Sequence, residues 1–396
     1  MSRSRASGPP DVSERLPSAA GACADCLRRS WLLAELSAVL DCNCRADGRL
    51  LELLELEDHL LIAALGGRRR GELRRRHAAM KLTAATPVAT VCRHVARCPR
   101  LARDANGLAA LHVRGGLERL QELTARPVVA FVGAGARASD YGIALAASLA
   151  RGLAAAGVSV AGGLLGGIGP AALGGALELG GPALGVPAGA LDTGAPARRR
   201  ALCERLTRGG CAISELPCGS VRRRWSAVAS ERLLATLADV ALVVESEQTP
   251  NALAGARVAA SLGRPIAAVP GRVGSPASRG PHALLREGAR LVTCASDVLD
   301  LVCDAELDAA REATALPHAY DGLDPSLRAM LERIGAGADT PGRLLGASED
   351  AGELLRALGE LELMGLLVRG DGARYVLREP FVEPAARYGG RDQMEP

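Results

Sequence analysis

The sequence predicts an α/β protein: a Rossmann-like domain with a parallel sheet, flanked by an N-terminal helical domain and a C-terminal winged-helix-like domain. Three observations lead to this prediction. Apolar residues recur at helical spacing before residue 125, short apolar strands alternate with Ala/Leu-rich helices in the middle, and helices followed by a hairpin end the chain. With 396 residues, 48% of them hydrophobic, the chain has enough apolar material for two or three cores.

The first 125 residues divide into a leader and a helical region. Residues 1–20 are rich in Ser, Pro and Arg without an apolar period, which predicts a disordered leader. Between 21 and 125, leucines such as Leu32, Leu36 and Leu40 recur at helical spacing, and a polar stretch at 41–48 interrupts them. We expect a helical domain here, of the sterile-alpha-motif or helix-hairpin-helix kind.

The pattern changes at residue 126, where β-rich apolar runs begin to alternate with helical stretches. Such alternation is typical of a parallel sheet that is covered on both faces, so we expect a Rossmann-like domain over 126–303. The expected strands lie at 128–132, 158–160, 184–186, 211–213, 240–244, 266–269 and 290–292.

A linker is expected at 304–318, because the segment is rich in Ala, Asp and Glu and ends near Pro317. Over 319–380 the pattern predicts helices at 326–334, 340–345 and 351–364, then a hairpin with its turn at 369–372. Three helices and a hairpin in this order are typical of a winged helix. We expect residues 381–396 to form a tail.

Composition excludes several classes of protein. The net charge of +4 is too small for a chain that coats nucleic acid along its whole length, and 2% aromatic residues are too few for binding by base stacking alone. Neither an apolar run long enough to span a membrane nor a signal peptide is visible, so we expect a cytoplasmic protein without membrane contact. The 11 cysteines are then expected to be reduced thiols.

Two glycine-rich turns follow expected strands and precede expected helices. Gly133-Ala134-Gly135 fits a dinucleotide fingerprint, but the acidic residue that should bind ribose after the second strand is missing, so we predict no nicotinamide cofactor. Backbone N–H groups at such turns can still bind phosphate oxygens. The alternative is that these glycines only let helices pack close to the sheet.

Arginines provide the second predicted anion-binding feature. Arg222, Arg223 and Arg224 follow the expected strand at 211–213, at the edge where open α/β sheets bind ligands, and Arg232 comes soon afterwards. The neighbouring Trp225 could stack on a base or simply pack in the core.

The sequence does not contain the usual signatures of catalysis. There is no nucleophile elbow, triad or P-loop, so we predict no catalytic residues. Cys23-x-x-Cys26 could bind zinc together with Cys42-x-Cys44 or with Cys92-x-His94, whereas scattered buried thiols are a common alternative. Because neither second pair has standard spacing, we predict no metal site and leave this zinc alternative open.

A set of motifs resembles the DNA-processing protein A family (DprA, also called Smf). The matching blocks lie in the family's order and spacing between about 23 and 303, and they include Leu216-Pro217-x-Gly219, Arg222–Trp225, Val243-Val244-Glu245, Gly263-Arg264-Pro265 and Gly280-Pro281-His282. The resemblance implies a non-catalytic protein that binds single-stranded DNA, forms a homodimer and loads RecA recombinase during natural transformation.

The chain departs from the family pattern at polar positions. The first glycine turn is one residue longer, which places its arginine at Arg137, and the second loop has Gly162, Gly169 and Leu173 where the family has polar residues. Glu231 replaces a neutral amide, and a like-charged group beside phosphate is unfavourable.

The leading hypothesis is therefore a phosphate-binding rim for single-stranded DNA. Its predicted members are Gly133, Gly135, Arg137, Gly163, Gly166, Gly167, Arg222, Arg223, Arg224 and Arg232. Two alternatives are a nucleotide-processing hydrolase of the lysine-decarboxylase-like Rossmann fold, whose glycine-rich loop is missing here, and a regulator that binds duplex DNA through the winged helix.

Overall fold

The computed structural model describes residues 21–43, 49–80, 88–94, 108–133, 138–178, 180–192, 197–305, 323–335, 340–345, 350–364, 366–370 and 374–377. It divides into two compact units, Met1–Glu306 and Leu307–Pro396. Within the described residues, no helix is both long and apolar enough to cross a bilayer.

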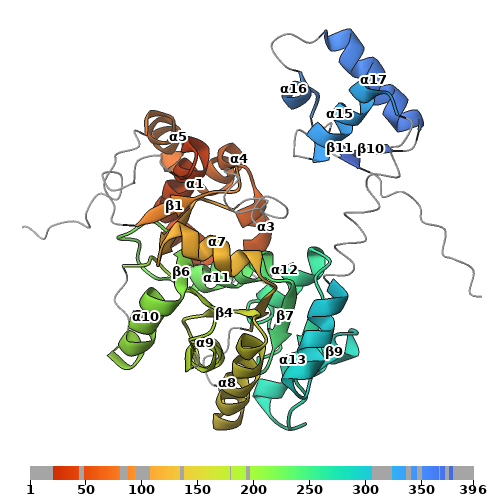
Figure 1. Cartoon of the computed structure of the whole chain (residues 1–396). Helices are drawn as coiled ribbons and strands as arrows, with labels where there is room; N and C mark the ends of the chain where they lie inside the picture. Colours follow the sequence, from red (N-terminus) through yellow and green to blue (C-terminus); the bar gives the residue numbers. More distant parts are fainter. Residues whose placement is uncertain are drawn as a thin grey trace, which may run out of the picture. The chain divides into compact units, whose positions relative to one another are not determined.

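The first unit is built on a nine-stranded sheet with the order β1-β2-β6-β5-β4-β3-β7-β8-β9 (Figure 1). The strands from β6 to β9 in this order are parallel, and β2 and β1 add to the β6 edge in antiparallel pairing. The strands are β1 (Ala89–Val91), β2 (Leu111–Arg114), β3 (Val128–Phe131), β4 (Ser159–Gly163), β5 (Ala183–Val186), β6 (Cys211–Ser214), β7 (Val240–Val243), β8 (Ile266–Ala268) and β9 (Arg290–Leu291).

The parallel strands are buried on both faces, which explains why they read as continuous apolar runs. One apolar core joins the sheet to α7, α11, α12 and α13, and a second core on the other face joins it to α8, α9 and α10. The covering elements are α7 (Leu117–Ala125), α8 (Asp140–Ala155), α9 (Ile168–Glu178), α10 (Ala197–Gly209), α11 (Arg224–Leu237), α12 (Ala254–Ser261), η3 (Pro276–Ser278) and α13 (Arg279–Arg286).

The N-terminal helices pack on α11 through a third core that contains both tryptophans, Trp31 and Trp225. They are α1 (Ala24–Glu35), α2 (Ser37–Asn43), α3 (Arg49–Glu55), α4 (Asp58–Leu65), η2 (Gly67–Arg69) and α5 (Arg70–Ala79). The sequence predicts a helical domain over 21–125, and this prediction is incomplete, because β1 and β2 lie in this region and extend the central sheet. These two strands have only three and four residues, too short for an alternating pattern to stand out.

Among its described residues, the second unit contains three helices followed by an antiparallel hairpin, around a small core that includes Leu331, Leu358 and Tyr375. This is the element order expected from the sequence. The elements are α15 (Pro325–Gly335), α16 (Pro341–Leu344), α17 (Ala351–Leu363), β10 (Leu367–Gly370) and β11 (Arg374–Leu377).

Candidate nucleic-acid interface

The order of the strands reverses at β3, which pairs with β4 on one side and β7 on the other. Ligands of open α/β sheets bind beyond the carboxyl ends of the strands at such a point. The loops that follow β3, β4, β5, β6 and β7 all begin at this end of the sheet, where the carboxyl ends of the parallel strands lie. Most of the residues predicted to bind phosphate belong to these loops.

Gly133 follows β3 with a positive φ of 115°, and its N–H already has an anionic partner. The Glu231 carboxylate from α11 accepts this N–H at 2.8 Å. Burial raises the pKa of the Glu231 carboxyl to about 7, although the hydrogen bond from Gly133 opposes the shift. The N–H that was expected to bind a phosphate oxygen therefore serves an internal carboxyl group.

A second carboxylate lies at the start of α8. Glu245, which follows β7, accepts the backbone N–H of Ser139 at 2.8 Å and the Ser139 hydroxyl at 2.5 Å. Ser139 in turn caps α8 by accepting the N–H of Gly142 at 3.0 Å. Because a helix N-terminus favours negative charge, Glu245 occupies a position where a ligand anion would otherwise be stabilised.

The second glycine turn packs tightly against the start of α8. Gly166 has a positive φ of 71°, and a Cβ atom on Gly167 would lie 2.6 Å from the Cβ of Ala138. A Cβ atom on Gly169 would lie 2.2 Å from the carbonyl oxygen of Gly163. The contact with Ala138 explains Gly167 by close packing, the alternative that the sequence left open, and the positive φ accounts for Gly166. A Cβ atom on Gly163 would meet no atom closer than 3.9 Å, so packing of this position does not require glycine. Gly135 and Arg137 lie outside the described residues.

Arg222, Arg223 and Arg224 are exposed at the start of α11, on the loop that follows β6. Among the described residues, neither Arg222 nor Arg223 has a carboxylate partner. The Arg224 guanidinium lies 3.6 Å from the carboxylate of Asp41, which also accepts the Arg224 backbone N–H at 2.7 Å. The guanidiniums of Arg222 and Arg223 are therefore available to a ligand, whereas that of Arg224 also interacts with Asp41.

The loop that follows β5 is fastened to this arginine loop. The Gly219 N–H donates to the Asp192 carboxylate at 2.8 Å, and the Ser226 hydroxyl donates to the Ala188 carbonyl at 2.9 Å. The β5 loop leads into α10, so the first turn of α10 lies at the same edge of the sheet. Arg200 in that turn is exposed.

Comparison with known proteins identifies the family. Residues 94–303, about half of the chain, match the family described as DNA recombination-mediator protein A. The chain belongs to this family. It is 38% identical over 277 residues to a putative DNA processing protein DprA of Mycobacterium tuberculosis (strain H37Rv), which covers 69% of this chain and 70% of the relative. It is also 33% identical over 203 residues to protein Smf of Escherichia coli, which covers 51% of this chain and 53% of that protein.

The fold is similar to the structure of DNA processing protein A from Streptococcus pneumoniae. The TM-score is 0.54 at 24% identity, over 67% of this chain and 96% of the other. The likeness confirms a mixed α/β fold with a sheet rich in parallel strands. The family match and the 38% identical relative confirm the resemblance noted in the sequence.

The prediction that Arg232 belongs to the phosphate-binding rim is wrong, because this residue is buried. Its side chain is only 4% exposed, and it pairs with the Glu215 carboxylate at 2.8 and 3.0 Å. It also donates to the carbonyl of Leu54 at the end of α3. Arg232 therefore joins α11 to β6 and to the N-terminal helices, and it does not lie on the surface. Sequence spacing could not reveal this, because its partner Glu215 comes from a different element.

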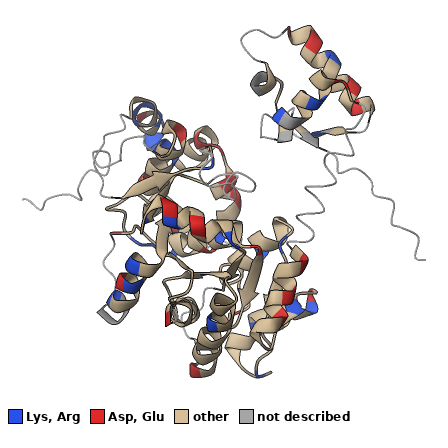
Figure 2. Ribbon diagram, viewed as in Figure 1, with Lys and Arg blue, Asp and Glu red and all other residues tan. Residues whose placement is uncertain are grey.

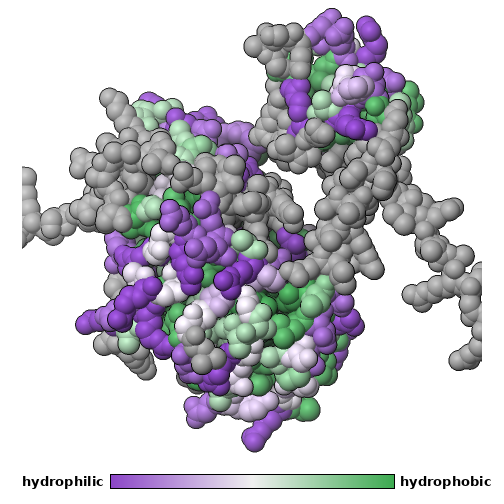
Figure 3. All heavy atoms as spheres, in the orientation of Figure 1, coloured by the Kyte–Doolittle hydropathy of each residue, from purple (hydrophilic) through white to green (hydrophobic). Residues whose placement is uncertain are grey.

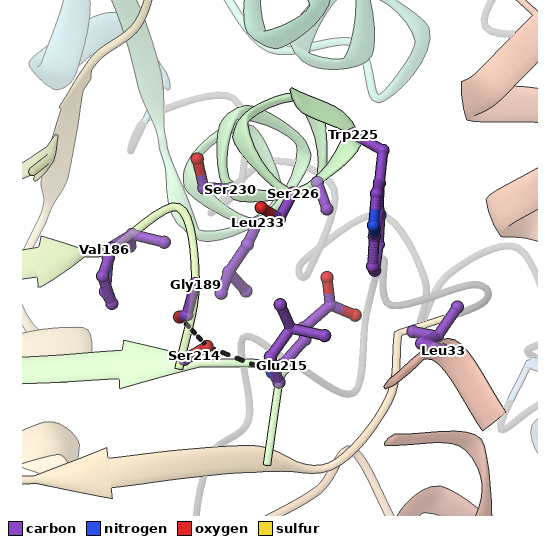
Figure 4. A pocket seen from close by; sticks show the side chains of 12 residues that line it. Leu33, Val186, Gly189, Ser214, Glu215, Trp225, Ser226, Ser230 and Leu233 are labelled. Carbon is purple, nitrogen blue, oxygen red and sulfur yellow. Dashed lines mark hydrogen bonds between the residues drawn. The ribbon is translucent and has the colours of Figure 1, made fainter. Parts of the chain in front are cut away.

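Trp225 packs in the core, which was the more common of the two alternatives, and it is not exposed to stack on a base. It is 1% exposed, and its indole N–H donates to the Ser37 hydroxyl at 2.9 Å. Beside it lies a narrow cavity between α11 and the ends of β5 and β6 (Figure 4). Its lining is mainly apolar, and its carboxylate, Glu215, belongs to the ion pair with Arg232. This arrangement is that of a packing gap.

The arginines of α10 were missed in the sequence interpretation. The helix appears banded in blue in Figure 2, and its surface is strongly hydrophilic in Figure 3. Its exposed members include Arg200, Arg205 and Arg208. The run Arg198-Arg199-Arg200 after an expected strand was the available signal, since it repeats the arrangement of Arg222–Arg224.

Proposed function

We propose that this chain is a cytoplasmic, non-catalytic DNA-processing protein that binds single-stranded DNA along an arginine rim. The arginine rim consists of Arg200, Arg222, Arg223 and Arg224. The observation that carries the proposal is the exposure of Arg222 and Arg223, without carboxylate partners among the described residues, at the ligand-binding edge of the sheet. Membership of the DNA recombination-mediator protein A family supports DNA as the ligand.

The glycine turns have a different part in this proposal from the one expected. They shape this end of the sheet, because the Gly133 N–H already donates to Glu231 and Gly167 packs closely against the start of α8. Phosphate binding then depends on guanidiniums, which bind phosphate oxygens in a bidentate manner. Gly135 and Arg137 remain candidates for the same surface.

Further parts of the proposal follow from the family resemblance. The DNA-bound protein would act as a homodimer and load RecA recombinase on incoming strands during transformation. The three helices and hairpin of the second unit have the order of a winged helix, which we infer to be an accessory DNA-binding module.

The test is a fluorescence-anisotropy titration of a labelled single-stranded oligonucleotide at several salt concentrations, with duplex DNA as the competitor. Arg222→Ala/Arg223→Ala should weaken binding about tenfold at low salt. It should also make the slope of log K against log salt about 1.4 units shallower, at about 0.7 per phosphate contact.

The matched control removes two arginines from the other end of the strands, where α13 ends and β9 begins. Arg286 and Arg290 are exposed, and the Arg290 guanidinium lies 3.9 Å from the Asp304 carboxylate at the surface. Arg286→Ala/Arg290→Ala lowers the net charge equally but should leave the salt slope unchanged. Equal losses in both variants would show a nonspecific charge effect, and stronger binding of the duplex would reassign DNA binding to the second unit.

A further inference from the structure

Three cysteines and a histidine converge where the first helix meets the edge of the sheet. Cys23, Cys26, Cys92 and His94 each offer one ligand atom, and these atoms all lie within 4.8 Å of one another. A tetrahedral zinc site with Zn–S bonds of about 2.3 Å separates its sulfurs by about 3.8 Å. The cluster is therefore compact enough to surround a single ion after only small side-chain adjustments.

The fold brings the four residues together from two distant segments. Cys23 is the N-cap of α1 and Cys26 lies in its first turn, whereas Cys92 directly follows β1. The Cys23 N–H donates to the Cys92 sulfur at 3.3 Å, which is typical of the N–H···S contacts that support thiolate ligands. The Cys26 carbonyl accepts the N–H of Ala110 at 3.0 Å. These two hydrogen bonds hold the backbone of Cys23 and Cys26 in place at the cluster.

His94 presents its Nδ1 atom to the sulfurs. This nitrogen lies 3.2 Å from the Cys23 sulfur and 3.4 Å from the Cys26 sulfur. The other ring nitrogen faces the Arg93 side chain at 3.2 Å. A metal bound at Nδ1 leaves Nε2 protonated, so Arg93 has to turn away from the ring when the ion binds.

The chemistry of the donors selects the ion. Thiolates and imidazole favour zinc over magnesium or calcium, and three cysteines with one histidine form a closed tetrahedral set without an open position. Cys42, the other partner suggested by the sequence, is exposed on α2 and outside this cluster, and Cys44 lies outside the described residues.

We propose that Cys23, Cys26, Cys92 and His94 form a structural Zn²⁺ site that fastens the start of α1 to β1. The small core around it, formed by Ala22, Leu27 and Ala110 with the buried thiols, contains little apolar bulk. A metal cross-link would add the stability that this corner lacks in apolar contacts. The site lies outside the arginine rim and does not depend on the proposed DNA binding.

The test begins with the metal content of the untagged full chain, purified under reducing conditions with Zn²⁺ in the growth medium. Mass spectrometry of the metals should give about one zinc per chain. X-ray absorption should give three Zn–S bonds of about 2.3 Å and one Zn–N bond of about 2.0 Å. Less than about 0.1 equivalent of zinc after addition of Zn²⁺, or a coordination shell without sulfur, would overturn the proposal.

Variants identify the ligands. Cys92→Ser and His94→Ala should each lose most of the zinc, and the chelator-induced fall in the melting temperature of the wild type should disappear with it. Cys42→Ser and Cys294→Ser change exposed thiols elsewhere and should keep the full zinc content. Zinc loss from Cys42→Ser but not from Cys92→Ser would refute this ligand set. If Cys92→Ser does not fold, the exposed His94 still gives a decisive variant.

Discussion

The Glu231 carboxylate accepts the backbone N–H of Gly133 at 2.8 Å, at the point where the strand order of the sheet reverses. An α/β protein that binds anions at this point would leave the N–H for its ligand. Here the partner is a buried carboxyl group from the chain itself, and it has space because Gly255 has no Cβ, which would lie 2.7 Å from a Glu231 oxygen. The consequence is a titratable group at the centre of the fold.

The first prediction concerns the pH dependence caused by Glu231. Because its pKa is raised from 4.5 to about 7 in the folded protein, the protonated form stabilises the fold below pH 4.5. That stability is lost as the pH rises through 7, by on the order of 3 kcal/mol. Glu231→Gln should remove this fall and raise the free energy of unfolding at pH 8. Urea denaturation followed by tryptophan fluorescence measures it, since both tryptophans lie in the first unit.

The control for this experiment is Glu204→Gln on α10, where the side chain is exposed. It should leave the pH profile of stability unchanged. An unaltered profile in Glu231→Gln would show that Glu231 ionises normally in the folded protein.

The second prediction concerns His112 in β2, which is 0% exposed and has no hydrogen-bond partner for either ring nitrogen among the described residues. Burial lowers the pKa of His112 to about 4. The neutral ring is therefore tolerated above pH 6.5, and stability is lost as the pH falls towards 4, by on the order of 3 kcal/mol. His112→Phe should flatten this acid limb, which urea titrations between pH 4 and 7 measure.

His77 provides the comparison, because it lies 2.8 Å from Asp58 and thus has an anionic partner. His77→Phe should leave the acid limb attributed to His112 in place. An acid limb that survives in His112→Phe would contradict the prediction.

The sequence predicted the alternating strands and helices of the central region well, because buried parallel strands are apolar along their whole length. It also predicted the loops that follow the carboxyl ends of these strands. It could not predict that Glu231 serves Gly133 or that Glu215 pairs with Arg232, since these contacts join separate elements. The same limit explains why the sequence could not decide between the two possible zinc ligand sets. Cys92 is brought close to Cys26 by β1, a strand that is too short to be recognised from the sequence.

The third prediction concerns the buried ion pair of Arg232 and Glu215. Arg232→Ala leaves a buried carboxylate without its partner and should lower the free energy of unfolding by about 3–5 kcal/mol. Replacing both residues by methionine should cost much less than the sum of the two single changes. Urea denaturation measures both quantities. Arg119→Ala breaks the more exposed pair with Glu122 and should cost about 1 kcal/mol or less.

The fourth prediction concerns Asp41, whose carboxylate shares Arg224 at 3.6 Å and accepts its backbone N–H. Asp41→Asn keeps an oxygen that can accept this N–H but removes the charge that competes with phosphate. Single-stranded DNA should therefore bind a few-fold more tightly at low salt, with a salt slope steeper by about 0.7. Anisotropy titrations measure both. Asp25→Asn, at an exposed carboxylate paired with Arg28, removes the same charge elsewhere and should have a smaller effect. An equal gain in both variants would mean that Arg224 does not contact the strand.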